Sequence, residues 1–212
     1  MLWGARSGGL ELRQESGGDV VMTGRFPYNK SAVLTDGGKK GRPRKERIAS
    51  RAFGYRINTP SDHGGKKDIH FLVGHDWDRP LASTRSGTLD ITDTDEAVIF
   101  VATITVELQQ ANYVRDFLAG YAAGLILGLS PGFRIPPERV SPKAESVEEE
   151  DPSEGMAIIR TVHDALLYEL SAVTRPAYTE AQIEARNWIT NAETPALASD
   201  VRRVLNARNR WR

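Results

Sequence analysis

The chain has 212 residues, the size of one full domain, and its 28 Lys and Arg balance 28 Asp and Glu, so charge does not name a partner. It has no cysteine, which excludes disulfides, thiolate metal sites and cysteine nucleophiles. Its longest apolar stretch, residues 122–129, is far shorter than the ~20 residues that span a bilayer. We therefore expect a soluble, intracellular globular protein, with no secretory signal in its first six residues.

Short strands between glycine-rich turns dominate the predicted structure from the start. Residues 1–15 are unpatterned and predict a flexible N-terminus, and residues 17–25 predict the first strand. Residues 35–47 carry six basic side chains and a proline, which predicts a loop. Residues 48–57 alternate in side-chain size with a period of two, which predicts a half-buried strand.

The middle of the chain combines strands with one helix. Residues 68–74 predict a strand that ends at His75, and residues 89–91 and 97–106 predict a hairpin. Apolar side chains at helical spacing over residues 111–122 predict the one central helix. A strand over residues 125–129 is then expected to run into a bend at residues 130–133.

The last third begins with an acidic stretch. Residues 140–155 hold six acidic side chains and are predicted to be a mobile surface loop. Residues 157–162 and 165–173 predict a hairpin, and residues 179–212 predict a basic helical tail. Together these elements predict a mainly β domain over residues 16–178: a small antiparallel β-barrel of seven or eight strands, closed or nearly closed, with one inserted helix.

Histidine is the scarce ingredient for acyl transfer in a chain without cysteine. Of the four histidines, His75 follows an apolar strand beside Gly74 and is the candidate general base. A turn residue bonded to Asp76 or Asp78 is the plainer alternative. His70 is interpreted as a hydrogen-bonded residue of its strand. The spacing of residues 63, 70 and 75 does not favour a metal site, and no cofactor is expected.

Ser130 and Glu169 complete the candidate site. The predicted bend presents Ser130 from a rigid strand end, as a nucleophile requires, although a plain Ser-Pro-Gly turn stays open. Pro131 has no N–H, so the backbone of Gly132 is the candidate oxyanion donor. Glu169 interrupts an almost apolar strand and needs a partner there. That partner is either a cation across the sheet or the far nitrogen of a histidine.

Three blocks of sequence carry a family resemblance when taken in order: Gly74-His75-Asp76-Trp77-Asp78-Arg79-Pro80-Leu81, Gly128-Leu129-Ser130-Pro131-Gly132-Phe133, and Leu167-Tyr168-Glu169-Leu170-Ser171-Ala172-Val173-Thr174-Arg175-Pro176-Ala177. They resemble the HK97-type prohead maturation proteases of tailed phages over about residues 16–178. The resemblance implies a β-barrel related to the herpesvirus assembly proteases, with His75 as base, Ser130 as nucleophile and Glu169 as the orienting third member. Pro131 departs from the aliphatic residue that commonly follows the family's serine.

The resemblance also implies a function. It implies a serine endopeptidase that works through an acyl-enzyme on Ser130, during procapsid maturation, inside the assembling procapsid in the host cytoplasm. Its implied substrates are the major capsid protein, the scaffold protein and the enzyme itself. Residues 179–212 are interpreted as a docking or self-cleaved segment. A homodimer stays open, and no membrane partner is expected.

Two other functions compete with proteolysis. A non-catalytic scaffolding or structural module could keep the same barrel and bind capsid protein through charged loops. Nucleic-acid binding through the basic residues 39–47 and the Arg-rich C-terminal segment is disfavoured, because no array of aromatic side chains accompanies the basic runs. Solvated surface is the ordinary interpretation of both basic segments.

Overall fold

The computed structural model describes residues 4–7, 10–14, 18–38, 41–61, 64–126 and 128–178. This part of the chain is mainly β, with thirteen strands in three sheets, two α-helices and one short 3-10 helix. Within the N-terminal segment predicted to be flexible, residues 4–7 and 10–14 instead form strands. The other residues of that segment, His63 and the predicted tail at residues 179–212 lie outside the described residues. None of the helices within these ranges has the length and apolar character needed to cross a membrane.

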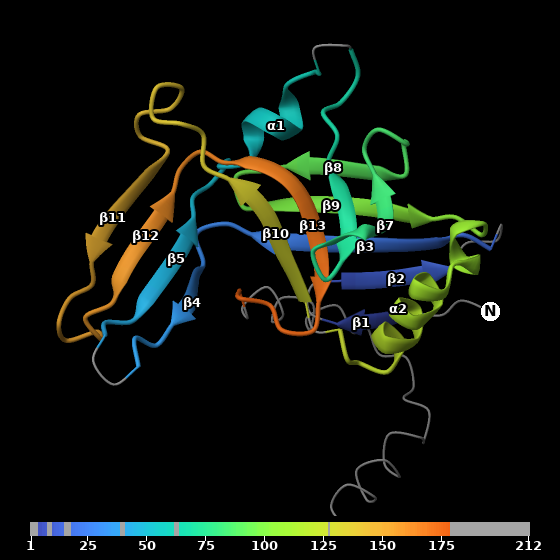
Figure 1. Ribbon diagram of the computed structural model, residues 1–212, viewed down its shortest axis with the longest axis horizontal. Coiled ribbons are helices and arrows are strands. Elements are labelled where there is room, and N and C mark those ends of the chain that lie inside the picture. The colour runs from blue at the N-terminus through green and yellow to red at the C-terminus, as the bar shows by residue number, and fades with distance from the viewer. Residues whose placement is uncertain are drawn as a thin grey trace, which may run out of the picture.

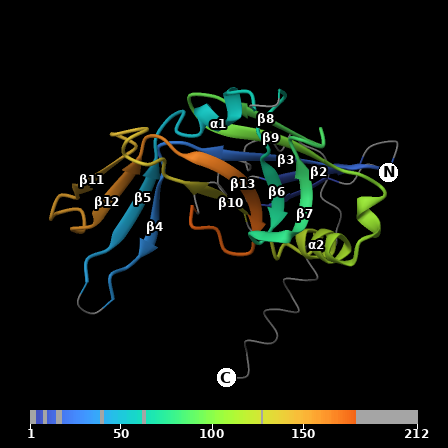
Figure 2. The same ribbon diagram turned by 45° about the horizontal axis from the view of Figure 1, so that its top comes forward.

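The three sheets are distinct in Figures 1 and 2. The five-stranded sheet has the order β1 (Gly4–Ser7), β2 (Leu10–Gln14), β3 (Val20–Pro27), β9 (Ala97–Ile104), β8 (Leu89–Asp93). The central sheet has the order β10 (Gly128–Arg134), β13 (Leu166–Val173), β6 (His70–Val73), β7 (Asp76–Ser83). The lateral sheet, which stands to one side in both views, has the order β11 (Glu145–Glu149), β12 (Ile158–Val162), β5 (Arg44–Ile48), β4 (Ser31–Thr35).

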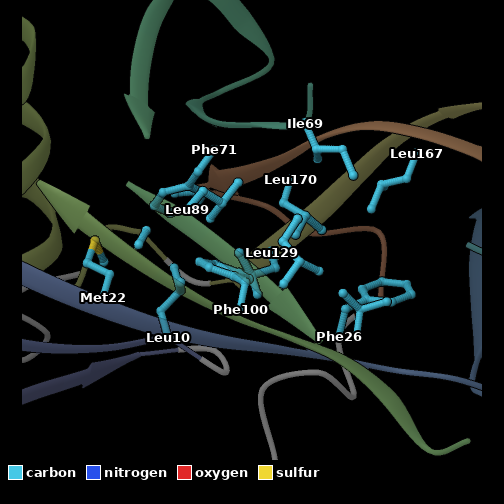
Figure 3. Packing of buried hydrophobic residues seen from close by; sticks show 14 of the residues in the cluster. Leu10, Met22, Phe26, Ile69, Phe71, Leu89, Phe100, Leu129, Leu167 and Leu170 are labelled. Carbon is cyan, nitrogen blue, oxygen red and sulfur yellow. The ribbon is translucent and has the colours of Figure 1, made fainter. Parts of the chain in front are cut away.

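The hydrophobic core lies between the five-stranded sheet and the central sheet. Figure 3 shows Phe71, Leu129 and Leu170 of the central sheet facing the side chains of the five-stranded sheet. The rings of Phe71 and Phe100 have centroids 4.8 Å apart across this interface. Because one face of the central sheet is covered in this way, its polar residues are confined to the other face.

Helix α2 (Asn112–Ala122) closes one end of these two sheets. It buries Val114, Phe117 and Tyr121, the helical stripe that the sequence predicts. The hydroxyl of Tyr121 donates to the carbonyl oxygen of Leu10 on β2, and that of Tyr113 donates to the carbonyl oxygen of Pro80 on β7. The predicted helix is confirmed, as are the strand at β6 and the β8–β9 hairpin. A 3-10 helix, η1 (Leu108–Gln110), precedes α2, and a short helix, α1 (Gly54–Asn58), lies between β5 and β6 in the chain.

The mainly β class is confirmed, but the predicted antiparallel barrel, closed or nearly closed, is wrong. All three sheets are open, and two pairs of strands are parallel, β13 with β6 and β12 with β5. The predicted hairpin over residues 157–162 and 165–173 is also wrong, because β12 and β13 belong to different sheets. The chain crosses between the sheets at residues 163–165, where the N–H groups of His163 and Asp164 both donate to Ala144 and that of Ala165 donates to Ala52.

The predicted loop and strand over residues 35–57 are also corrected. β5 lies largely inside the predicted loop. Its charged side chains pair with acidic residues in or just after β11: Lys45 with Glu150 and Arg47 with Glu148. The predicted strand instead contains a turn and α1. Arg51 has a φ of 62°, a left-handed conformation that ends extended structure.

Two further segments are more regular than predicted. Residues 130–133 belong to β10, which continues through Ser130 and Pro131 and has one register shift against β13, between Gly132 and Phe133. The proline is tolerated because β10 is an edge strand of the central sheet. The acidic segment 140–155, which is predicted to be a mobile loop, contains β11. This strand pairs with β12 and places Glu145 against Arg160.

Candidate active site

His75 lies in the two-residue turn that joins β6 to β7. Val73 and Asp76 are partners at the ends of these strands, so Gly74 and His75 form the whole turn, and both have a φ of 63°. Positive φ at both central positions is the pattern of a type I′ turn, whose twist matches that of a hairpin. His75 thus has a left-handed backbone that few side chains adopt, and 46% of its side chain is exposed.

Strand β13 holds this turn through two hydrogen bonds. The N–H of Gly74 donates to the carbonyl oxygen of Ala172 at 3.0 Å. The N–H of His75 donates to the side-chain Oγ of Ser171, also at 3.0 Å. A left-handed residue other than glycine costs on the order of 1–3 kcal/mol and persists where its surroundings fix it. These two bonds to β13 provide that fixation.

Glu169 lies behind the histidine, with only 4% of its side chain exposed. Its Oε1 is 2.7 Å from Nδ1 of His75, and its Oε2 accepts a hydrogen bond of 2.6 Å from the hydroxyl of Ser171. A buried carboxylate is costly unless it is paired and hydrogen-bonded. Both oxygens of Glu169 have a partner, so the partner that the sequence requires for this residue is His75.

The carboxylate also determines the chemistry of the imidazole. The hydrogen bond that the imidazole donates to Glu169 raises the pKa of His75, partial burial of the ring opposes this increase, and the negative charge of Glu169 adds to it. When Nδ1 carries its proton and donates to Glu169, the lone pair of the neutral ring is on Nε2. The pair therefore leaves Nε2 as the nitrogen that can accept a proton.

Ser130 lies in the adjacent strand β10, on the same face of the central sheet. It is directly opposite Ser171 in the register of β10 and β13, and opposite residues of an antiparallel pair project to the same face. A pocket of about 380 Å³ is lined by both Ser130 and His75, together with Gly74, Ile126, Val173 and Arg175. The structure thus brings the serine, the histidine and the carboxylate of the predicted site together.

Gly132 has a steric role that the sequence does not reveal. It is the partner of Glu169 across β10 and β13, and the side chain of Glu169 lies over it. A Cβ atom at this position would lie 1.8 Å from Oε1 of Glu169 and 2.6 Å from its Cδ. Only glycine leaves room for the carboxylate in this place.

The direction of the Gly132 backbone bears on its predicted role as oxyanion donor. The carbonyl of Ala172 points toward β6, where it accepts from Gly74. Because backbone groups alternate in direction along a strand, those of Glu169 point toward β10. The N–H of Gly132, opposite Glu169, then points into the ladder between β10 and β13. The oxyanion role stays a prediction, and this geometry favours the steric role.

The other candidates are in different surroundings. The aspartates beside His75 do not bind its ring, since Asp76 instead pairs with Arg79 at 3.2 Å and accepts from the N–H of Asp78. His70 packs against Trp77, with ring centroids 5.3 Å apart. His163 follows β12, at the edge of the lateral sheet, and contacts Ser146 there. Within the described ranges, no group of three or more His, Asp or Glu side chains could hold a metal ion.

Sequence reasoning missed two residues of this site. Ser171 is fully buried and bonds both Glu169 and the turn of His75. A second polar residue two positions after a buried acid in the same strand projects to the same face, and that signal could have identified it. Arg175 lines the pocket from the segment after β13, and no spacing in the sequence predicts that position.

A comparison with protein-family models gives one finding. The model described as caudovirus prohead serine protease matches residues 28–194, a range that includes every residue of the site. Among curated proteins and among solved structures, nothing matches the chain.

Proposed function

Because the chain belongs to the caudovirus prohead serine protease family, we propose that it is a serine endopeptidase with Ser130 as nucleophile, His75 as general base and Glu169 as the residue that orients the imidazole. One observation supports this most: the buried carboxylate of Glu169 binds Nδ1 of His75 at 2.7 Å, and the same histidine shares a pocket with Ser130. This is the arrangement in which a base is fixed in one tautomer beside a hydroxyl.

The proposed reaction has two halves. Oγ of Ser130 attacks the peptide carbonyl while Nε2 of His75 accepts its proton, and the tetrahedral intermediate collapses as the imidazolium protonates the leaving amine. This leaves an ester on Ser130. Water then attacks the ester with His75 again as base, and the serine hydroxyl and a carboxylic acid are released. Glu169 keeps its charge throughout and stabilises the imidazolium.

The developing oxyanion needs a donor. The N–H of Gly132 points toward β13, so we assign this task in the proposal to Arg175, the cationic side chain that lines the pocket. A guanidinium near the oxygen would stabilise the negative charge that forms there. The backbone of residues near Gly132 is the alternative.

The family is described as one of prohead serine proteases, which supports a role in prohead maturation for this chain. We propose capsid and scaffold proteins as its substrates, self-cleavage as a further reaction, and the interior of the assembling procapsid in the host cytoplasm as its place of action. A homodimer stays an open proposal.

Mass spectrometry of the purified chain beside its Ser130→Ala variant tests the proposal. Incubated with prohead proteins, the unaltered chain is expected to release defined fragments of these proteins or of itself, and Ser130→Ala none. Ser146→Ala is the matched control, because Ser146 also contacts a histidine, His163, with 2.9 Å between Oγ and Nε2. This control should cleave normally. Cleavage retained in Ser130→Ala would remove Ser130 from the mechanism, and an intact, inactive wild type would favour a scaffolding module.

A further inference from the structure

We infer that Ser171 is a positioning residue of this site: one hydroxyl orients the carboxylate of Glu169 and at the same time fixes the turn that presents His75. The inference rests on the proposed function and adds Ser171 to the three residues Ser130, His75 and Glu169 and the proposed oxyanion donor Arg175.

The hydrogen-bond directions around Ser171 are determined by chemistry. The backbone N–H of His75 can only donate, so Oγ of Ser171 accepts from it at 3.0 Å. A carboxylate can only accept, so the hydroxyl donates its one proton to Oε2 of Glu169 at 2.6 Å. Glu169 returns to His75 through Oε1 and Nδ1. These bonds form a closed ring in which the histidine is held at its backbone and at its side chain.

The ring is shielded from water where it matters. Ser171 has no exposed surface and Glu169 is 3% exposed, so water does not replace either bond of the hydroxyl. On its other side the carboxylate lies against Gly132, where even a methyl group would not fit. The carboxylate is thus confined by Gly132 and oriented by Ser171, and its remaining oxygen faces the imidazole.

Ser171 does not line the pocket, so its removal should affect the catalytic step more than substrate binding. In Ser171→Ala, Oε2 of Glu169 and the N–H of His75 lose their partner together, in a buried position. We expect kcat to fall by about 10- to 100-fold, by analogy with the loss of an outer-shell residue that orients a metal ligand, with KM unchanged.

The pH profile provides a readout that a merely structural role would not move. The hydroxyl stabilises the carboxylate most when His75 is neutral, because the charge of Glu169 is then unbalanced. Its loss therefore favours the imidazolium and raises the pKa of His75. The acid limb of kcat against pH should move to higher pH in Ser171→Ala.

Thr84→Val is the matched control. Thr84 is also buried, and its hydroxyl also accepts from one group, the N–H of Ile69, and donates to another, the carbonyl of Lys67. Losing this hydroxyl should cost comparable stability and leave the pH profile unmoved. A Ser171→Ala protein that folds and keeps the wild-type kcat, or whose kcat falls equally at every pH, overturns the inference.

Two measurements in the Ser130→Ala background separate this inference from the proposed function, because neither needs cleavage. The pKa of His75, followed by NMR, should rise when Ser171→Ala is added, and no change overturns the inference. Should that double variant not fold, hydrogen exchange in Ser130→Ala alone decides. A protected His75 amide supports the inference, and exchange as fast as in exposed turns overturns it. Cleavage that persists in Ser130→Ala refutes only the peptidase mechanism.

Discussion

A serine and a histidine occur together at two places in the molecule, lining one pocket beside the central sheet and in contact at the edge of the lateral sheet, and their surroundings differ. On the lateral sheet Oγ of Ser146 is 2.9 Å from Nε2 of His163, both side chains are exposed, and within the described residues no carboxylate pairs with this histidine. On the central sheet His75 is bound at Nδ1 by a buried carboxylate. A serine beside a histidine is therefore not by itself a catalytic arrangement, because in a triad a third group must hold the imidazole in one tautomer and orientation.

The acidic residues of strand β11 in the lateral sheet differ from Glu169 in the same way. Glu148 and Glu149 of the lateral sheet pair with Arg47 and Arg42 at 3.6 and 3.0 Å, with 59% and 76% of their side chains exposed. Such exposed pairs contribute little to stability. Glu169 is buried and has two hydrogen-bond partners, so disturbing it should cost far more.

Of the variants that test this difference, Gly132→Ala is expected to have the largest effect. The new methyl group would displace the carboxylate of Glu169 from His75, and loss of the orienting acid lowers kcat by on the order of 10³ to 10⁴-fold. Glu169→Gln should cause a loss of similar size, and the double variant should be no worse than either. Peptide-cleavage kinetics measure this.

Gly120→Ala is the control for that prediction. In α2 a methyl group at Gly120 meets only Ile126, at 3.9 Å, so this variant should keep full activity and gain roughly 0.5–1 kcal/mol of stability. Normal cleavage by Gly132→Ala would mean that Glu169 is not needed in its observed position.

The next largest effect is expected in the pH dependence of cleavage, because in the described part of the chain only His75 of the two histidines is paired with a carboxylate. A base is active only when neutral, and Glu169 raises the pKa of His75, so cleavage should decline toward acid with an apparent pKa above that of an ordinary histidine. Glu169→Gln should move this limb to lower pH. Because the folded pKa of His75 is raised, its pairing also stabilises the fold at low pH, and this contribution disappears as pH rises through the raised pKa. A rate profile flat from pH 5 to 8 would contradict a histidine base.

A moderate effect on stability is expected at Tyr178, which follows β13 of the central sheet and contacts the lateral sheet. The hydroxyl of Tyr178 donates to Oε1 of buried Glu46 on the lateral sheet at 2.8 Å, and its ring packs on Phe26 with centroids 5.0 Å apart. Tyr178→Phe removes only the hydrogen bond and should cost about 1–3 kcal/mol of unfolding free energy, measured by urea denaturation. Unchanged stability would show that Glu46 is satisfied by Arg160 alone.

The smallest effect is expected from Glu148→Gln on the lateral sheet. Its exposed pairing with Arg47 should contribute less than about 1 kcal/mol, so both the urea midpoint and the rate of cleavage should stay close to those of the wild type. A loss as large as that of Tyr178→Phe would show that the exposed ion pairs hold the lateral sheet together.

Local pattern identified the elements whose stability is local. The apolar stripe at Val114, Phe117 and Tyr121 predicted α2, and β-branched runs predicted the β8–β9 hairpin. The sequence also drew attention to His75 as a scarce base and to Glu169 as a lone acid in an apolar strand. These inferences require only neighbouring residues.

Pairing over long distances could not be predicted. In sequence, β5 and β11 resemble loops because they are rich in charged residues. They form strands because partners on other strands balance these charges, as Arg160 of β12 does for Glu145 of β11. The parallel pairing of β13 with β6 joins segments that no turn connects, and it places Glu169 beside the His75 turn. Ser171 gains its role only through this pairing.

The same parallel pairing has a consequence for biosynthesis. His75 and Glu169 are 94 positions apart, and a ribosome adding roughly 5 to 20 residues per second needs about 5 to 20 s to pass from one to the other. During that interval the nascent polypeptide has its imidazole but not its carboxylate. In the proposed mechanism, translation itself therefore delays assembly of the site, because no chain shorter than 169 residues holds both groups.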